Sequence, residues 1–430
     1  MLQLLVKNAR LADGSGPQDI AVDDGRIVEI APRIDAEAVR VIDAGGQLVS
    51  PPFVDPHFHM DATLSLGMPR LNRSGTLLEG IALWGELKPL LTHEAVIERA
   101  MRYCDLAVAQ GVQAIRSHVD VCDDRLTATA ALIEVRRLVA PYIDLQLVAF
   151  PQDGLYRSST AEANLLRALD MGIDVVGGIP HFERTMADGA ASVRRLCEIA
   201  AERGLLVDVH CDESDDPMSR HVETLAAETV RLGLQGRVTG SHLTSMHSMD
   251  NYYASKLIPL IAEAGLHAIP NPLINITLQG RSDTYPRRRG LTRIAELRAA
   301  GVNIAFGQDC TMDPWYSLGS ADMLDVAHMG IHAVPMTSRE AMRWAFDAVT
   351  VNSAKAMGLP DTALAVGRPA RFVVLQARDP IEAIRLRATR LFVVRDGRVI
   401  AETAPRLARL AMAGRPESLN PADYAPAAED

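Results

Sequence analysis

Eight short apolar runs, each ending in polar residues and followed by a stretch with helical spacing, constrain the fold of this chain most. The runs are rich in β-branched and aliphatic side chains and cover residues 48–59, 113–120, 143–152, 174–181, 205–213, 237–245, 267–275 and 302–310. Strict alternation of strand and helix produces a parallel sheet, and eight such units can close into a barrel. We therefore predict an α/β fold with a (β/α)8 TIM-type barrel over residues 51–359.

Two of the intervening stretches carry further helical signals. Residues 93–110 have apolar side chains at helical spacing. Ser159 and Glu162 have the spacing of a capping box, which predicts a helix over residues 163–171.

The two ends of the chain have a different pattern, with β-type runs and no helices between them. Asp24-Gly25 and Asp396-Gly397 are each flanked by alternating apolar residues, which is a strong signal for a β-hairpin. Residues 1–50 plus 360–404 are therefore predicted to form one small β-sandwich-like domain from both termini. Residues 405–430 form a C-terminal tail, rich in Pro, Ala and acidic residues from Gly414 onward, and we expect it to be flexible or to reach a neighbouring subunit.

Composition excludes several classes of protein. The 430 residues are 48% hydrophobic, and the net charge of −10 disfavours binding to nucleic acid. Five cysteines without CxxC spacing fit a reducing compartment. The start of the chain lacks the pattern of a signal peptide, and no apolar run is long enough to span a membrane. We expect a cytoplasmic protein that does not bind membranes.

Four metal-ligand side chains fall at predicted strand ends. His57 and His59 can share one face of a strand because side chains alternate faces with a period of two. His210 ends the fifth strand and Asp309 the eighth. His210 alone could be a core histidine, and Asp309 alone could cap a loop. Together, three imidazoles and a carboxylate suit Zn²⁺ or Fe²⁺ with a position left for water.

The lysines bear on how many metal ions to expect. A two-metal site of this kind typically needs a bridging, carboxylated lysine at a strand end. The chain contains Lys7, Lys88, Lys256 and Lys355, and none lies at a predicted strand end. We therefore expect one divalent metal ion.

Three residues are candidates for proton transfer. A bound metal would lower the pKa of its water toward neutrality, and hydrolysis would then need a proton carrier. Glu213 lies three residues after His210, and its carboxyl could pass a proton to a ring nitrogen, although Asp212 and other acidic neighbours could make it part of a solvated loop. His242 could orient the attacking water or stabilise charge on oxygen, and Asp309 could move a proton to the leaving group.

These segments together resemble the amidohydrolase superfamily and, more specifically, bacterial cytosine deaminases. The segments that carry the resemblance are PPFVDPHFH (51–59), SGTLLEGI (74–81), HVDV (118–121), VAFPQ (148–152), VDVHCDE (207–213), QGRSDTYP (279–286) and DPWY (313–316). The His-x-His motif marks only the superfamily, whereas Phe-Pro-Gln and the run at 210–213 are more specific to the deaminases.

The resemblance implies hydrolytic deamination of a free pyrimidine base by a homo-oligomer with one Fe²⁺ or Zn²⁺ ion. It implies His57, His59, His210 and Asp309 as metal ligands, Glu213 as proton shuttle and His242 beside the attacking water. Gln152 would bind the O2/N1 edge of the pyrimidine, which suits a carboxamide because it both donates and accepts hydrogen bonds. The Leu77 backbone and the Trp315 ring would shape the pocket.

One residue departs from the pattern of the resembled family. Cytosine deaminases typically have two successive aspartates after the eighth strand, and here Asp309 is followed by Cys310. A small neutral side chain at that position would make room for a C5 substituent. This predicts 5-methylcytosine as the first substrate, with cytosine a weaker or comparable one. Neutral drift is the alternative explanation, and Cys310 could also be a nucleophile or a fifth ligand.

Other functions remain possible from the sequence alone. The same residues could deaminate another amino-heterocycle, such as an isoguanine-like base or a triazine. A cyclic amidase of hydantoinase type is disfavoured by the missing strand-end lysine. A non-catalytic barrel is disfavoured because the expected ligands are present.

Overall fold

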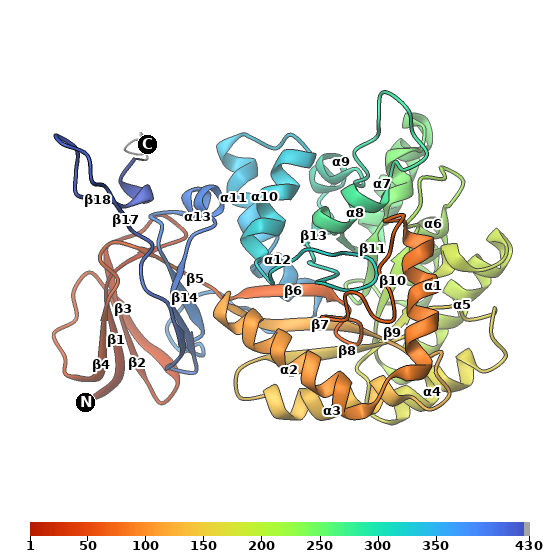
Figure 1. Ribbon diagram of the computed structural model, residues 1–430, viewed down its shortest axis with the longest axis horizontal. Helices are drawn as coiled ribbons and strands as arrows, with labels where there is room; N and C mark the ends of the chain where they lie inside the picture. The colour runs from red at the N-terminus through yellow and green to blue at the C-terminus, as the bar shows by residue number, and fades with distance from the viewer. Residues whose placement is uncertain (425–430) are drawn as a thin grey trace.

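The computed structural model describes residues 1–424, which form a closed barrel beside a smaller β domain (Figure 1). The eight barrel strands pair in sequence order, and every pairing is parallel. They are β6 (Phe53–Phe58), β7 (Val112–Asp120), β8 (Asp144–Phe150), β9 (Val175–Gly178), β10 (Leu206–Cys211), β11 (Val238–His242), β12 (His267–Ile269) and β13 (Asn303–Ile304). A parallel bridge between Phe58 and Asp309 closes the ring, which confirms the predicted barrel.

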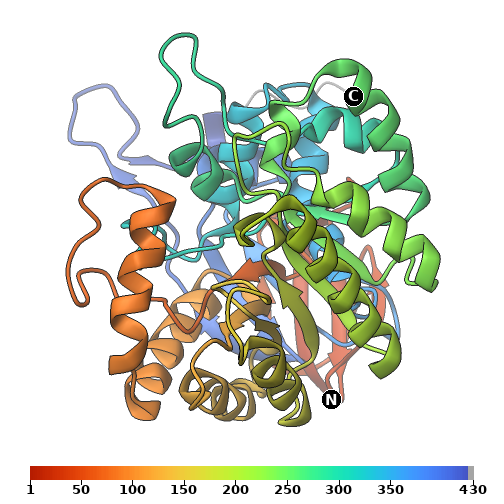
Figure 2. The ribbon, with the colours of Figure 1, turned by 90° about the vertical axis from the view of Figure 1, so that its right-hand side faces the viewer.

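Helices follow the strands and surround the barrel (Figures 1 and 2). The α-helices are α1 (Leu77–Leu87), α2 (His93–Ala109), α3 (Thr127–Val139), α4 (Ala161–Asp170), α5 (Met186–Arg203), α6 (His221–Leu232), α7 (Asn251–Glu263), α8 (Pro272–Leu278), α9 (Ile294–Ala299), α10 (Met323–Ala333), α11 (Arg339–Asp347) and α12 (Val351–Ala356). Short 3-10 turns are η1 (Lys88–Leu90), η2 (Pro180–Phe182) and η3 (Thr244–His247). Helix α2 matches the predicted stretch 93–110 and begins after Thr92, whose side chain accepts the N–H of Ala95.

The predicted capping box at Ser159 is wrong, although the helix itself is present. Helix α4 begins after Thr160 and has no side-chain cap. The Glu162 carboxylate accepts a hydrogen bond from Arg195 Nε over 2.7 Å instead of reaching back to the helix start. A long-range ion pair has therefore replaced the local contact that the spacing predicted.

The predicted run 48–59 consists of two strands in two different sheets. Residues 48–50 form β5 (Leu48–Ser50), which pairs with β1 and β14 of the small domain, and β6 begins the barrel. Pro51 and Pro52 separate them because proline has no N–H to donate to a ladder.

The small domain uses strands from both ends of the chain, as predicted. Its strands are β1 (Leu2–Leu11), β2 (Gln18–Asp23), β3 (Arg26–Ala31), β4 (Ala38–Asp43), β5, β14 (Phe372–Leu375), β15 (Arg390–Arg395) and β16 (Arg398–Glu402), and helix α13 (Pro380–Leu386) connects β14 to β15. Asp24-Gly25 joins β2 to β3 and Asp396-Gly397 joins β15 to β16, with positive φ at all four residues. Gln3 links the two turns because its side chain binds Gly25 N–H and Asp396 C=O.

The small domain contacts the amino-terminal ends of the barrel strands. Gln113 at the start of β7 donates to Val394 C=O over 2.9 Å, and Arg395 lies 2.6 Å from Asp144 of β8. The carboxyl ends of the strands, where barrel enzymes have their active sites, therefore lie away from it. In the described part of the chain, no helix is long and apolar enough to cross a membrane.

Much of the predicted tail 405–430 packs against the small domain. It contains β17 (Ala408–Arg409), β18 (Ser418–Leu419) and η4 (Pro421–Tyr424). The Gln376 amide donates to Arg406 C=O over 3.1 Å and to Asn420 Oδ1 over 3.3 Å. These contacts tie residues 405–424 to the residue that follows β14, whereas the prediction for residues 425–430 lies outside the described residues.

Candidate metal centre and active site

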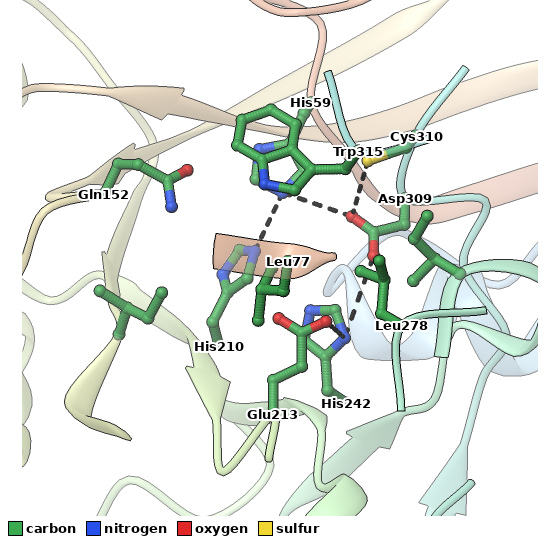
Figure 3. Close-up of a pocket in the computed structure, with 12 residues that line it drawn as sticks. His59, Leu77, Gln152, His210, Glu213, His242, Leu278, Asp309, Cys310 and Trp315 are labelled. Atoms are coloured by element: carbon green, nitrogen blue, oxygen red, sulfur yellow. Dashed lines mark hydrogen bonds and ion pairs between the residues drawn. The ribbon is translucent and has the colours of Figure 1, made fainter. Parts of the chain in front are cut away.

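The carboxyl ends of the barrel strands surround a pocket (Figure 3). The residues that line it are His59, Leu77, Gln152, Ile179, His210, Glu213, His242, Ile274, Leu278, Asp309, Cys310 and Trp315. Every predicted site residue except His57 is in this set. His57 is fully buried next to the pocket, and the centroid of its ring lies 4.6 Å from that of His210 and 4.9 Å from that of His242. The apolar residues Ile179, Ile274 and Leu278 were not predicted, because nothing in the sequence distinguishes them from core residues.

Histidine nitrogens and a carboxylate converge at the bottom of this pocket. His59 Nε2 lies 2.9 Å from His210 Nε2 and 3.3 Å from Asp309 Oδ1. Two overlapping groups have all their ligand atoms within 4.8 Å of one another, namely His57, His59, His118 and His210, and His57, His210, His242 and Asp309. The predicted quartet is thus divided between them, with His57 and His210 in both groups. His118, the first residue of the HVDV segment, was not predicted as a site residue.

The chemistry of these side chains fits a divalent metal ion. Burial lowers the pKa of His57, His59 and His210 well below the usual histidine value, so the rings are neutral and can offer lone pairs. Among residues 1–424, His57 Nε2 has no hydrogen-bond partner. A buried, unpaired nitrogen in a group of imidazoles and one carboxylate is suited to metal binding.

Close packing of the last strand against the first positions Asp309. Its N–H donates to His57 C=O over 2.8 Å, and its C=O accepts from His59 N–H over 3.0 Å. Gly307 permits this approach, since a Cβ there would lie 2.8 Å from the His57 Cβ. Asp309 has φ +67°, a strained conformation for a residue with a side chain, and such strain is common at functional sites.

The strained turn after β10 directs Glu213 into the pocket. Asp212 has φ +54°, and its carboxylate accepts the backbone N–H groups of His221 and Val222 at the start of α6. Glu213 follows Asp212 in the chain. Burial is the larger cause, and the negative charge of Asp309 the smaller one, that raises the pKa of Glu213 well above its usual range. Glu213 can therefore hold a proton near neutral pH.

His242 lies beside Glu213, with 3.5 Å between its Nδ1 and Glu213 Oε1. Burial lowers the pKa of His242 to about 3, although the charge of Asp309 opposes the shift. The Asn275 amide donates to His242 Nδ1 over 2.9 Å, so this nitrogen carries a lone pair. Asn275 was not predicted, because it follows β12 on helix α8 and only the fold brings it to His242.

Gln152 and Cys310 lie on opposite sides of the pocket (Figure 3). Gln152 follows β8, and the adjacent Asp153 forms a 2.7 Å ion pair with Lys88 that anchors this loop. Cys310 packs in an apolar cluster with Ile274, Leu278 and Tyr316, against which Leu77 and Trp315 also pack. Burial, reinforced by Asp313 and Asp309, raises the pKa of the Cys310 thiol, so it is neutral and a poor nucleophile.

Comparisons with known proteins identify the family to which this chain belongs. Residues 40–401 match the model described as the amidohydrolase family. The chain is 44% identical to the 5-methylcytosine deaminase of Klebsiella pneumoniae, whose crystal structure with 5-fluorocytosine superposes with a TM-score of 0.92 over 94% of this chain and 99% of that one. It is 30% identical to a pterin deaminase of Rhizobium rhizogenes over 92% of this chain and 90% of that protein. It is 28% identical to the N-isopropylammelide isopropyl amidohydrolase of Pseudomonas sp. strain ADP, over 93% of this chain and 97% of that protein. The chain therefore belongs to the amidohydrolase family.

Proposed function

We propose that this protein catalyses the hydrolytic deamination of a free aminopyrimidine base, 5-methylcytosine or cytosine, to thymine or uracil and ammonia. The observation that carries the proposal is the pocket itself, in which a buried carboxyl, Glu213, and a carboxamide, Gln152, lie around a cluster of neutral imidazoles. The 44% identity to the Klebsiella enzyme supports the same substrate class.

His57, His59, His210 and Asp309 would hold one divalent ion, Fe²⁺ or Zn²⁺. Such an ion, when bound, supplies Lewis acidity and lowers the pKa of a water molecule toward neutrality. The neutral nitrogens and the single carboxylate at these positions match the ligand preference of both metals.

Proton transfer falls to three side chains of the pocket. Glu213 holds a proton that it can donate to the pyrimidine ring nitrogen, because its pKa is raised. His242 stays neutral and can orient the attacking water. Asp309 takes one proton from that water and delivers it to the departing amine. The hydroxyl proton left on the ring carbon returns to Glu213, so that water and the aminopyrimidine yield the oxo base and ammonia and Glu213 is again protonated.

The two sides of the pocket would recognise different edges of the base. The Gln152 amide supplies a donor and an acceptor for the O2/N1 edge. The opposite wall places the small Cys310 among Ile274 and Leu278, where a C5 methyl group would be buried. Burial of one methyl group contributes about 0.8 kcal/mol, a several-fold preference for the methylated base.

Ammonia release from purified, metal-loaded protein tests this function directly. Cytosine, 5-methylcytosine and isoguanine are compared by kcat/KM, with a Glu213→Gln variant as the background control. We expect the wild-type protein to turn over at least one of the two pyrimidines, and we expect the Glu213→Gln variant not to do so. Absence of turnover with both pyrimidines would contradict the proposal.

Deamination of another amino-heterocycle is the second candidate function. It is favoured by the relatives of this chain, which include the pterin deaminase and the isopropylammelide hydrolase. Pterin and N-isopropylammelide therefore belong in the same panel. A kcat/KM for either that exceeds the pyrimidine values would support this candidate instead.

A further inference from the structure

A chain of hydrogen bonds inside the barrel leads to His57, and the proposed mechanism does not account for it. It runs from Arg116 of β7 through Asp208 of β10 and Ser241 of β11 to His57 of β6. All four side chains are completely buried. Buried polar groups are costly unless each is paired, so this connection across four strands is a specific feature of the interior.

The distances identify continuous hydrogen bonds. Arg116 Nη1 donates to Asp208 Oδ2 over 2.9 Å. Ser241 Oγ donates to the other oxygen, Asp208 Oδ1, over 2.7 Å. His57 Nδ1 lies 2.9 Å from Ser241 Oγ. The guanidinium is always protonated and neutralises the carboxylate, which leaves Asp208 as a pure acceptor.

The donors and acceptors in this series of hydrogen bonds determine which nitrogen of His57 carries the proton. A serine hydroxyl has one hydrogen, and Ser241 gives it to Asp208, so its oxygen offers only lone pairs to His57. His57 must then donate through Nδ1–H. A neutral imidazole carries one N–H, so His57 Nε2 is left with a lone pair. Within the described chain this His57 Nε2 has no hydrogen-bond partner, and it lies 3.5 Å from Asp309 Oδ1.

We propose that Asp208 and Ser241 are positioning residues that hold His57 in its Nδ1–H tautomer and thereby set the affinity of the centre for a divalent metal ion. Groups that bind the second nitrogen of a histidine ligand fix its tautomer and ring orientation, and their loss typically weakens metal binding 10- to 100-fold. The inference rests on the proposed role of His57 as a metal ligand, and it does not depend on the substrate.

Zinc affinity measured without substrate, by competition with a chromophoric chelator, tests the role of Ser241. Ser241→Ala removes the acceptor for His57, and we expect about 10- to 100-fold weaker binding. Ser241→Thr keeps a hydroxyl and should recover most of the affinity. Ser245→Ala is the matched control, since it removes a buried hydroxyl that donates to Ser219 C=O over 2.8 Å.

Different results would contradict the proposed metal site and the proposed role of Ser241. If the wild-type protein binds no zinc, the ligand assignment itself fails. If it binds zinc and Ser241→Ala binds as tightly as Ser245→Ala, the role of Ser241 is overturned.

The tautomer can also be observed without relying on the folding of a Ser241 variant. Nitrogen-15 NMR of metal-free wild-type protein with labelled histidine, with the His57 signals assigned from a His57→Gln sample, should show the proton on Nδ1. A proton on Nε2 would contradict the inference.

Discussion

Glu213 and His242 face each other at 3.5 Å, and burial moves their pKa values in opposite directions. The carboxyl becomes a weaker acid and the imidazole a weaker base, so both are neutral at the same pH. Two titratable groups whose pKa values are separated in this way provide a proton donor and a neutral hydrogen-bonding partner in one pocket. The proposed division of roles therefore follows from burial.

Glu213→Gln tests the proton-transfer role. The amide has nearly the same shape but cannot release a proton, so kcat should fall about 10²- to 10⁴-fold. The metal content should stay unchanged, because Glu213 belongs to neither ligand group. Steady-state ammonia release and metal analysis measure the two quantities. Activity within a few-fold of the wild type would rule out Glu213 as the proton carrier.

Cys310→Asp tests the proposed methyl-binding wall. The substitution would place a carboxylate beside Asp309 and the apolar residues Ile274 and Leu278. We expect the kcat/KM ratio of 5-methylcytosine to cytosine to fall several-fold, because the carboxylate is larger and hydrated. Cys310→Ser, which is small and neutral, should change the ratio less. An unchanged ratio in Cys310→Asp would remove the basis for methyl preference.

Asp313 should make the stability of the protein depend on pH. Burial raises its pKa to about 7, although the Cys310 thiol and the N–H groups of Trp315 and Tyr316 oppose the shift. Because the folded state binds this proton more tightly, the stabilisation is complete below pH ~4 and is lost as the pH rises through about 7. Asp313→Asn keeps an acceptor without titrating.

Thermal unfolding of the metal-free proteins between about pH 4 and 8 checks the Asp313 prediction. The melting temperature of the wild type should fall relative to that of Asp313→Asn as the pH increases. Parallel curves for the two proteins would contradict it.

Helix α1 contributes one wall of the pocket, and its sequence explains how. The Thr76 side chain caps the helix by accepting the Glu79 N–H over 3.3 Å, which places Leu77 at the pocket. One turn later Gly80 packs directly against the Trp315 indole. At the other end Lys88 forms 2.7 Å ion pairs with Asp120 and Asp153, joining the helix to the loop that carries Gln152.

Gly80→Ala should displace the Trp315 wall. A Cβ at position 80 would overlap with the indole ring, so the ring must move into or away from the pocket. Misplacement of a pocket wall by about 1 Å can lower kcat/KM as much as 100-fold, and we expect a loss of about 10- to 100-fold.

Gly85→Ala is the control on the same helix, because a Cβ there meets no heavy atom within 4 Å. It should retain activity and gain about 0.5–1 kcal/mol of stability from the higher helix propensity of alanine. Equal activity of the two variants would show that Trp315 does not depend on Gly80.

The small domain and the candidate metal site lie at opposite ends of the barrel. The small domain binds the amino-terminal ends of β7 and β8, whereas the candidate metal ligands lie at the opposite ends of β6, β10 and β13. A bound ion would therefore connect the first, fifth and eighth strands of the barrel across its interior. Metal binding should then stabilise the barrel as well as support catalysis.

Removal of the metal with a chelator should abolish activity and lower the melting temperature. At a free ion concentration 100 times Kd, binding adds about 2.7 kcal/mol of stability. Zn²⁺ or Fe²⁺ added back should restore both properties, and the metal that restores more activity identifies the functional ion. A protein that is fully active after complete metal removal would contradict the proposed centre.

Patterns that act over a few residues predicted their structures well. Asp24-Gly25 and Asp396-Gly397 form the expected turns because both residues adopt positive φ. The prediction failed where a contact from elsewhere in the chain competed, as when Arg195 took the Glu162 carboxylate. Two prolines also divided a run that hydrophobicity alone presented as one strand.

The sequence by itself determined the repeating strand and helix pattern and the placement of His57, His59, His210 and Asp309 at strand ends, because these depend on local periodicity and on the rule that parallel strands end at one face. Only the tertiary structure decided which other residues support them. Ser241 lies 184 residues from His57 along the chain, yet hydrogen-bonds to it. A hydroxyl, an amide or an isoleucine acquires such a role only through the neighbours that folding provides, and no local pattern encodes them.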